Sequence, residues 1–99
     1  MYQHIEKEMR GATRLKRVIL DPHAQDALED DNLRFADVLH CLLHGAIVSD
    51  QYDERYDEMK YEWRGAARDG REIAMIAKLT YTGKVYVITV YWLRWTEYD

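Results

Sequence analysis

Residues 72–93 read EIAMIAKLTY, then TGK, then VYVITVYWL, and they carry the strongest structural signal of the chain. Two runs rich in β-branched and aromatic residues flank a three-residue break centred on Gly83. Because glycine adopts positive φ without strain, this pattern predicts a β-hairpin that turns at Gly83. In the second run, apolar residues occupy both alternating sets of positions. Such a strand is typical of the middle of a sheet that is covered on each side.

Length and composition indicate one globular domain. The 99 residues are 47% hydrophobic and 12% aromatic, which is enough apolar material for a single core. We therefore expect residues 1–99 to form one domain. A lone cysteine, Cys41, excludes an internal disulfide. No apolar run reaches the ~18 residues of a membrane span and no signal-peptide pattern is present, so we expect a cytoplasmic protein without membrane contact.

Charge is distributed unevenly along the chain, although the net charge is only −4. Residues 1–20 carry +3, residues 21–62 carry −9 and residues 63–99 carry +2. A globally acidic protein is a poor non-specific ligand for nucleic acid, because such binding depends on neutralising phosphates. The two basic ends could still converge in space into one patch.

The N-terminal residues 1–17 are predicted to form a helical arm. One face of this helix carries Ile5, Met9, Ala12 and Leu15, at spacings of three and four. An adjacent stripe carries Arg10, Arg14 and Arg17. This stripe is either a solvated face near the helix C-terminus or a surface that contacts phosphates.

Two further helices are predicted after a short strand at Val18–Leu20. Asp21 and Pro22 form a typical helix start, with a capping carboxylate followed by proline at the first helical position. The next helix has its expected core face at Phe35, Val38, Leu39, Leu42 and Leu43. Gly45 follows it in the position where glycine commonly ends a helix.

The second half of the chain is predicted to be mainly strands. Strands are expected at 46–48 and 59–64, separated by an acidic loop over 49–58 that has no clear period, and a turn is expected over 65–70 before the central hairpin. Residues 94–99 are expected to form a frayed tail. The fold class is therefore α+β, with two to three helices packed on an antiparallel β-sheet that ends in a C-terminal hairpin, and residues 18–93 as its core.

The order of these elements resembles that of the small bacterial toxin superfamily of MqsR- and RelE-like mRNA interferases. It looks closest to a domain family of unknown function that is usually grouped with them. The matching motifs are His23-Ala24 at a helix start, Val38–Gly45 followed by Ile47-Val48, Asp69-Gly70-Arg71 at a turn, and Ile88-Thr89-Val90-Tyr91 in the last strand. The region between the two helices departs from the family, because 28–33 has neither the arginines nor the glycine that are common there.

The resemblance implies a RelE/MqsR-like fold and a toxin of a toxin–antitoxin system, acting as a metal-independent mRNA endoribonuclease under the control of an antitoxin partner. It transfers no catalytic residue one for one. Metal-free RNA cleavage needs a base for the 2′-hydroxyl, a cation for the phosphorane and an acid for the leaving oxygen. The candidate catalytic residues that could supply these groups are His23, Lys60, Arg71, Lys78 and Tyr91.

No cofactor or metal site is expected. His40 and His44 are four residues apart and Asp37 precedes them, but an isolated histidine pair on a solvated helix face is a weak motif. Cys41 has no recognisable base beside it and is expected to be an inert thiol.

A second interpretation is a catalytically silent protein-binding module of the same fold. The acidic segment 50–58 contains five carboxylates around Tyr52 and Tyr56, and tyrosines are frequent anchors in protein interfaces. In this interpretation the module works through the acidic segment, which binds a basic partner, or through the aromatic residues of the sheet. The sequence leaves the oligomeric state open.

Overall fold

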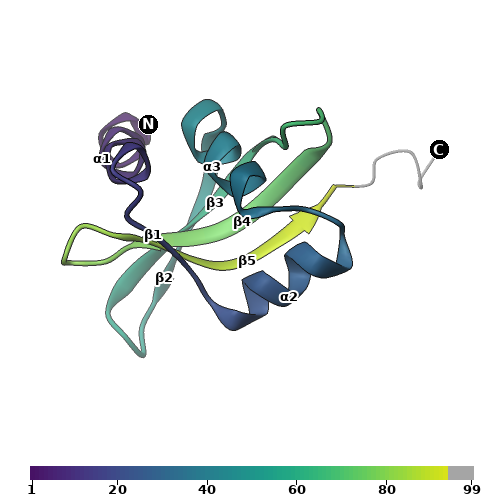
Figure 1. Cartoon of the computed structure of the whole chain (residues 1–99). Coiled ribbons are helices and arrows are strands. Elements are labelled where there is room, and N and C mark those ends of the chain that lie inside the picture. Colours follow the sequence, from purple (N-terminus) through teal and green to yellow (C-terminus); the bar gives the residue numbers. More distant parts are fainter. Residues whose placement is uncertain (94–99) are drawn as a thin grey trace.

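A computed structural model describes residues 1–93 as three helices and five strands (Figure 1). In chain order the elements are α1 (Gln3–Arg14), β1 (Val18–Leu20), α2 (Pro22–Asp30), α3 (Phe35–His44), β2 (Ala46–Asp53), β3 (Glu58–Ala66), β4 (Glu72–Leu79) and β5 (Val85–Trp92). The predicted tail at 94–99 lies outside the described residues. Within the described chain, no helix has the length and apolar character needed to cross a membrane.

The five strands form one mixed sheet in the order β1-β5-β4-β3-β2. Neighbouring strands among β2, β3, β4 and β5 pair antiparallel, so the predicted α+β class and the C-terminal hairpin are confirmed. The short strand β1 differs from the expectation of an antiparallel sheet, because it pairs parallel with β5. A parallel pair needs a long crossover connection, and here residues 21–84 provide it.

A β-bulge in β5 explains why that strand reads as apolar on both faces. The pairing of β4 with β5 shifts register between Ile76 and Ala77, which leaves Ile88 without a cross-strand partner. One extra residue reverses the alternation of side chains, so Val87 and Val90 are both buried although they are three residues apart. The expected cover on both faces is therefore wrong.

The three helices cover one face of the sheet, which we call the covered face. Buried side chains from α1, α2 and α3 join those of the covered face in a single cluster whose largest members are Met9, Leu42, Trp63, Ile73 and Met75. Helix α2 packs on β5, α3 packs on β3, and α1 packs on α3. Figure 1 shows α1 and α3 side by side, with α2 lying along β5.

Helix α3 buries a different stripe from the predicted one. Val38 and Leu42 are buried as expected, but Phe35 is 41% exposed, and Asp37 and Cys41 are buried instead. The reason is the close approach of α3 to β3. A Cβ atom at Gly65 would lie 3.1 Å from the Cys41 Sγ, so this side of the helix faces the sheet.

Gly45 serves a different purpose from the predicted one. Its φ of −88° lies outside the left-handed region. A Cβ atom at this position would lie 2.4 Å from the Arg64 carbonyl oxygen, so glycine is needed there for space.

The acidic segment 49–58 is mostly strand rather than loop. Strand β2 continues to Asp53 and β3 begins at Glu58, which leaves a four-residue turn. The Lys60 ammonium lies 2.8 Å from the Asp53 carboxylate, and Tyr52 donates its hydroxyl hydrogen to Asp57. These contacts offset part of the negative charge of the segment.

Candidate functional site

The face of the sheet opposite the helices, which we call the open face, carries most of the chemistry. Cross-strand pairing sets its members, because residues directly opposite one another point to the same side. They lie in three rows, which run Lys78, Tyr86 and Ile19; Glu62, Ile76 and Thr89; and Arg64, Ala74 and Tyr91. Lys60 belongs to the same face by alternation with Glu62 along β3.

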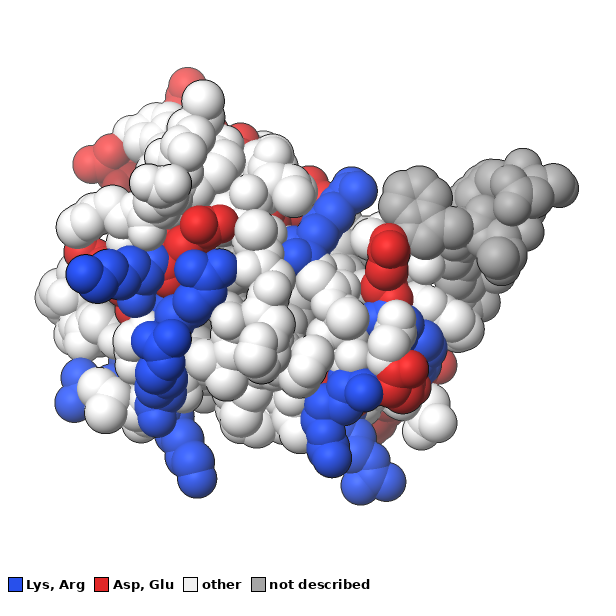
Figure 2. Space-filling model, turned by 90° about the horizontal axis from the view of Figure 1, so that it is seen from above, with Lys and Arg blue, Asp and Glu red and all other residues white. Residues whose placement is uncertain are grey.

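Pairing of β1 with β5 brings the two basic ends of the chain together. Val85 donates its backbone N–H to the Arg17 carbonyl oxygen at 2.9 Å, which places Arg17 beside Lys84. Arg14 is the last residue of α1 and Lys16 follows two residues later, so both lie just before Arg17 in the chain. Residues 9–20 and 73–93 contain no carboxylate side chain. We call Arg14, Lys16, Arg17 and Lys84 the basic patch. Figure 2 shows several Lys and Arg side chains on the α1 side of the molecule and a second group at the other end.

A cluster of ionisable groups lies next to this patch on the open face. Tyr86 donates its hydroxyl hydrogen to Asp21 Oδ2 at 2.5 Å, and the other carboxylate oxygen accepts the backbone N–H of His23 at 2.9 Å. The Lys78 Nζ lies 5.3 Å from the centre of the Tyr86 ring. We call Asp21, His23, Lys78 and Tyr86 the Tyr86 cluster.

The pKa values in the cluster follow from these contacts. The hydrogen bond from Tyr86 lowers the pKa of Asp21, with smaller contributions from the His23 backbone N–H and from the charge of the His23 imidazole. The hydrogen bond to Asp21 raises the pKa of Tyr86, and partial desolvation adds to it. In neutral solution Asp21 is therefore a carboxylate, and Tyr86 keeps its proton and donates it.

Both candidate lysines lie on the open face with carboxylate partners. Lys60 pairs with Asp53, and its hydrogen bond lowers the pKa of that carboxyl group. Lys78 pairs with Glu58 at 2.7 Å. A phosphate that binds either lysine must therefore share the ammonium with a carboxylate that is already present.

Tyr91 shares the open face but lies apart from the Tyr86 cluster. It pairs with Ala74, four residues along β4 from Lys78, which corresponds to about 13 Å along a strand. Desolvation raises the pKa of Tyr91, and the nearby Glu62 carboxylate adds to this effect.

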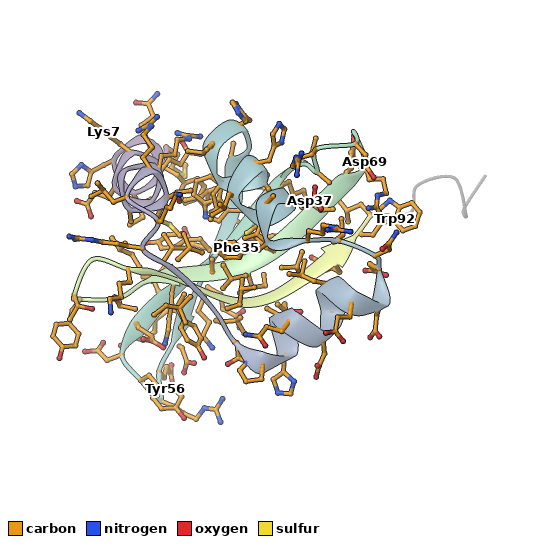
Figure 3. The ribbon with its side chains drawn as sticks, viewed as in Figure 1. Lys7, Phe35, Asp37, Tyr56, Asp69 and Trp92 are labelled. Carbon is orange, nitrogen blue, oxygen red and sulfur yellow. The ribbon has the colours of Figure 1, made fainter. Side chains whose placement is uncertain are left out.

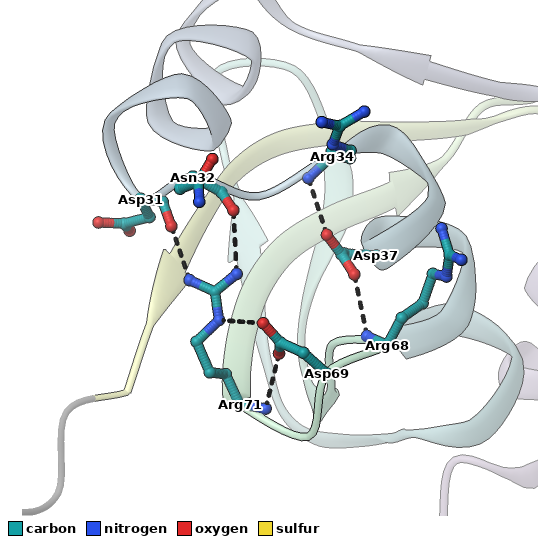
Figure 4. A network of polar contacts seen from close by, with 7 residues as sticks. All are labelled: Asp31, Asn32, Arg34, Asp37, Arg68, Asp69 and Arg71. Carbon is teal, nitrogen blue, oxygen red and sulfur yellow. Dashed lines mark hydrogen bonds and ion pairs between the residues drawn. The ribbon is translucent and has the colours of Figure 1, made fainter.

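Arg71 lies at the opposite end of β4 and does not join the other candidates. Its guanidinium donates to the backbone oxygens of Asp31 at 2.7 Å and Asn32 at 2.9 Å, and to the Asp69 carboxylate at 2.8 Å (Figure 4). The same group lies 5.1 Å from the centre of the Trp92 ring. These bonds connect the α2–α3 link to the β3–β4 turn, which is a structural role.

Asp37 completes this network from within α3. Its two carboxylate oxygens accept the backbone N–H groups of Arg34 at 2.8 Å and Arg68 at 2.9 Å. Figure 3 shows Asp37 on the inner side of α3, whereas Asp69 lies at the edge of the molecule. Because both oxygens of Asp37 are used, burying this carboxylate is tolerated.

The residues of the predicted histidine face have other partners. His40 Nδ1 lies 2.9 Å from the Ala66 carbonyl oxygen, and the His40 and His44 rings are 4.6 Å apart. Within residues 1–93, no group of three or more His, Cys, Asp or Glu side chains is arranged to hold a metal ion. Burial raises the pKa of the Cys41 thiol to about 12.

Sequence reasoning missed Asp21 and the position of Lys84. Asp21 was predicted only as a helix cap, which it is, but 65 positions separate it from Tyr86. No local pattern marks a parallel pairing over such a distance. The basic residues of the patch could be recognised in the sequence, but only the structure shows that they lie together.

Fold and open face together define a small α+β protein whose exposed sheet surface carries lysines paired with carboxylates and several tyrosines, with His23 exposed nearby in the first turn of α2. A family model described as a domain of unknown function, DUF4258, matches residues 20–92, and the chain belongs to this family. The match runs from the end of β1 to the end of β5 and leaves α1 outside. Comparisons with curated proteins and with solved structures found no significant match.

Proposed function

We propose that this protein binds RNA on the open face and cleaves it without a metal ion, as a toxin of the mRNA-interferase kind that an antitoxin partner restrains. The observation that carries this proposal is the parallel pairing of β1 with β5. This single pairing creates the basic patch at one end of β1 and the Tyr86 cluster at the other. A cationic surface for the phosphate backbone therefore adjoins groups that can move protons.

Binding would depend on the basic patch. The four cations of the patch lie in two segments, 9–20 and 73–93, that contain no carboxylate side chain. They can therefore attract a phosphate backbone even though the whole chain is acidic. Arg17 lies just before β1 and alternates with Val18, so it shares a face with Ile19. The backbone of a bound strand could therefore pass from Arg17 towards Asp21 over one short edge of the sheet.

Cleavage would depend on the Tyr86 cluster. An imidazole both accepts and donates protons in neutral solution, so His23 is the candidate to take the proton of the 2′-hydroxyl. The 2′-oxygen then attacks the adjacent phosphorus and forms a cyclic phosphate, while the bond from phosphorus to the 5′-oxygen breaks and the 5′-oxygen takes up a proton from solvent water. Lys78 is the candidate to stabilise the charge on phosphorus. Asp21 would hold the backbone of His23 at the start of α2, and the Tyr86 ring would lie beside the Lys78 ammonium.

RNA binding is tested by reversing charge in the patch. Arg17→Glu with Lys84→Glu should weaken the binding of a fluorescein-labelled single-stranded RNA, measured by anisotropy. The slope of log affinity against log salt should fall by about 0.7 for each lost phosphate contact. Arg34→Glu with Arg68→Glu makes the same total charge change at two exposed residues near the other end of β4 and should leave binding unchanged. Equal affinities of the wild-type protein and the double variant would reject the patch.

Cleavage is tested in cells and in solution. Production of the wild-type protein should arrest growth and degrade mRNA, and His23→Ala should relieve both effects. The purified protein should leave cyclic phosphate ends on RNA, with the same yield when a chelator is present. Normal growth and intact RNA at high expression would reject the proposal that the protein cleaves RNA. RNA binding would then be decided by the anisotropy measurements alone.

The acidic β2–β3 hairpin favours a second candidate function, binding of a basic protein partner. Tyr56 at its tip is 68% exposed, and Glu54 and Arg55 beside it are exposed as well. An exposed tyrosine next to a carboxylate is a suitable anchor for a basic peptide. Glu54→Lys should then slow association with a copurifying partner, and an unchanged association rate would count against this function.

A further inference from the structure

A groove lies between the two hairpin turns at one end of the sheet. The groove has a volume of about 530 Å³. Its lining includes Tyr56, Asp57 and Glu58 from the β2–β3 hairpin and Lys78 and Tyr81 from the β4–β5 hairpin. We call it the tyrosine groove, after the two rings at its rim. This volume lies within the ~300–1,000 Å³ range of pockets that hold small organic groups.

Both tyrosines are exposed beyond what the fold requires. Tyr81 is 102% exposed and Tyr56 is 68% exposed, so neither ring contributes to the core. Figure 3 shows Tyr56 at the tip of the β2–β3 hairpin, directed away from the helices. The Arg55 guanidinium lies 5.8 Å from the centre of the Tyr56 ring, which adds a cation to that side of the groove.

The turn that carries Tyr81 is held by hydrogen bonds. Thr80 donates its backbone N–H to the Lys84 carbonyl oxygen at 2.8 Å, and Gly83 donates to the Thr80 carbonyl oxygen at 2.9 Å. Lys84 also donates its backbone N–H to the Thr80 hydroxyl oxygen at 3.0 Å. A turn whose backbone is already fixed loses little backbone freedom on binding, which favours its use as a contact surface.

The carboxylates of the groove already have partners. Glu58 pairs with Lys78 at 2.7 Å, and Asp57 accepts a hydrogen bond from Tyr52. Their repulsion of a phosphate is therefore partly offset. The groove also opens beside the basic patch, because Tyr81 and Lys84 belong to the same turn.

We propose that the tyrosine groove holds an unpaired base of single-stranded RNA, stacked on Tyr81 and Tyr56. This inference rests on the proposed RNA binding and deepens it by naming the form of RNA that is bound. Every base has a π-face, so two exposed rings beside a cationic patch select unpaired strands without selecting a sequence. In a duplex the bases are stacked on one another and cannot enter the groove.

The test compares three oligonucleotides of equal length in anisotropy titrations. These are a single-stranded RNA, the same RNA annealed to its complement, and a strand with abasic sugars that keeps only the backbone charge. The variants are Tyr56→Ala with Tyr81→Ala and, as a matched control, Tyr56→Phe with Tyr81→Phe. Circular dichroism and thermal unfolding verify that each variant is folded.

We expect the alanine pair to lose about fivefold or more in affinity per ring for the single strand. The phenylalanine pair keeps both π-faces and should bind like the wild-type protein. Neither pair should change the affinity for the abasic strand. Equal binding of duplex and single strand by the wild-type protein, or an alanine pair with unchanged affinity, would overturn the inference. If the groove fails this test but charge reversal of the basic patch still abolishes binding, the proposed RNA binding stands. If the wild-type protein binds none of the three oligonucleotides, the proposed function itself is rejected.

Discussion

Tyr86 and Asp21 are joined by a 2.5 Å hydrogen bond on the open face, although 65 positions separate them in the chain. Leu20 in β1 pairs with Val87 in β5, and Asp21 follows directly, donating its backbone N–H to the Val87 carbonyl oxygen at 2.8 Å. Asp21 also caps α2. One carboxylate thus connects the edge of the sheet, the start of a helix and a tyrosine hydroxyl.

Replacing the Tyr86 hydroxyl should raise the pKa of Asp21. The hydrogen bond from Tyr86 is the largest cause of the lowered pKa of this carboxyl group, so Tyr86→Phe should bring the pKa closer to the usual value. Carboxyl carbon chemical shifts, followed by NMR as a function of pH, measure this change. Tyr91→Phe removes a hydroxyl elsewhere on the open face and should leave the Asp21 titration unchanged.

The same bond predicts how stability depends on pH. A carboxyl group whose pKa is lower in the folded chain stabilises the fold above its unfolded pKa, and this contribution is lost as pH falls through the folded pKa. The difference in unfolding free energy between wild type and Tyr86→Phe should therefore be larger at neutral pH than below the folded pKa of Asp21. A difference that stays constant over this acid range would contradict the assignment.

Removing the Asp37 carboxylate should destabilise the protein. Asp37→Ala leaves the backbone N–H groups of Arg34 and Arg68 without their acceptor in a part-buried region. We expect a loss of about 2–4 kcal/mol in the free energy of unfolding, measured by urea denaturation. Asp26→Ala changes an exposed residue of α2 and serves as the control. A loss for Asp37→Ala no larger than that of the control would show that the two hydrogen bonds contribute little.

The buried stripe of α3 can be tested by comparing two of its apolar residues. Leu42 is fully buried, so Leu42→Ala should cost about 2–5 kcal/mol. Phe35 is partly exposed, so Phe35→Ala should cost clearly less despite the larger side chain. Urea denaturation of both variants gives the comparison. The reverse order would support the stripe predicted from sequence rather than the one in the structure.

Local patterns predicted the elements, whereas contacts between distant segments decided the details. The central hairpin and α3 were recognisable because alternation and helical periodicity are properties of neighbouring residues. The bulge at Ile88 was hidden, because an extra residue in a strand looks the same as an apolar residue on the second face. The buried Asp37 was hidden for another reason, since its two backbone partners become visible only once α3 lies against the β3–β4 turn.

The candidate site was predictable to a similar degree. The sequence marked Lys60, Lys78 and Tyr91 as strand residues, but it did not place them on a common face. Unbroken alternation would put Tyr91 on the side of Val85 and Val87, and the bulge at Ile88 turns it to the open face. Arg71 is also a cation next to a strand, but nothing local distinguished a guanidinium that clamps backbone carbonyls from one that is free to bind phosphate.

Glu58 should limit RNA binding, because its carboxylate occupies the Lys78 ammonium. Glu58→Gln removes the negative charge while keeping the size of the side chain, and it leaves Lys78 free to contact a phosphate. We expect tighter binding of single-stranded RNA and a salt slope that is steeper by about 0.7, the value for one added contact with a single strand. Glu29→Gln makes the same change on the exposed surface of α2 and should alter neither quantity. Combining Glu58→Gln with Lys78→Gln should cancel the gain, because the freed cation is then absent. If Glu58→Gln binds RNA no better than the wild-type protein, phosphate does not reach Lys78, and the proposed path of RNA past the Tyr86 cluster is wrong.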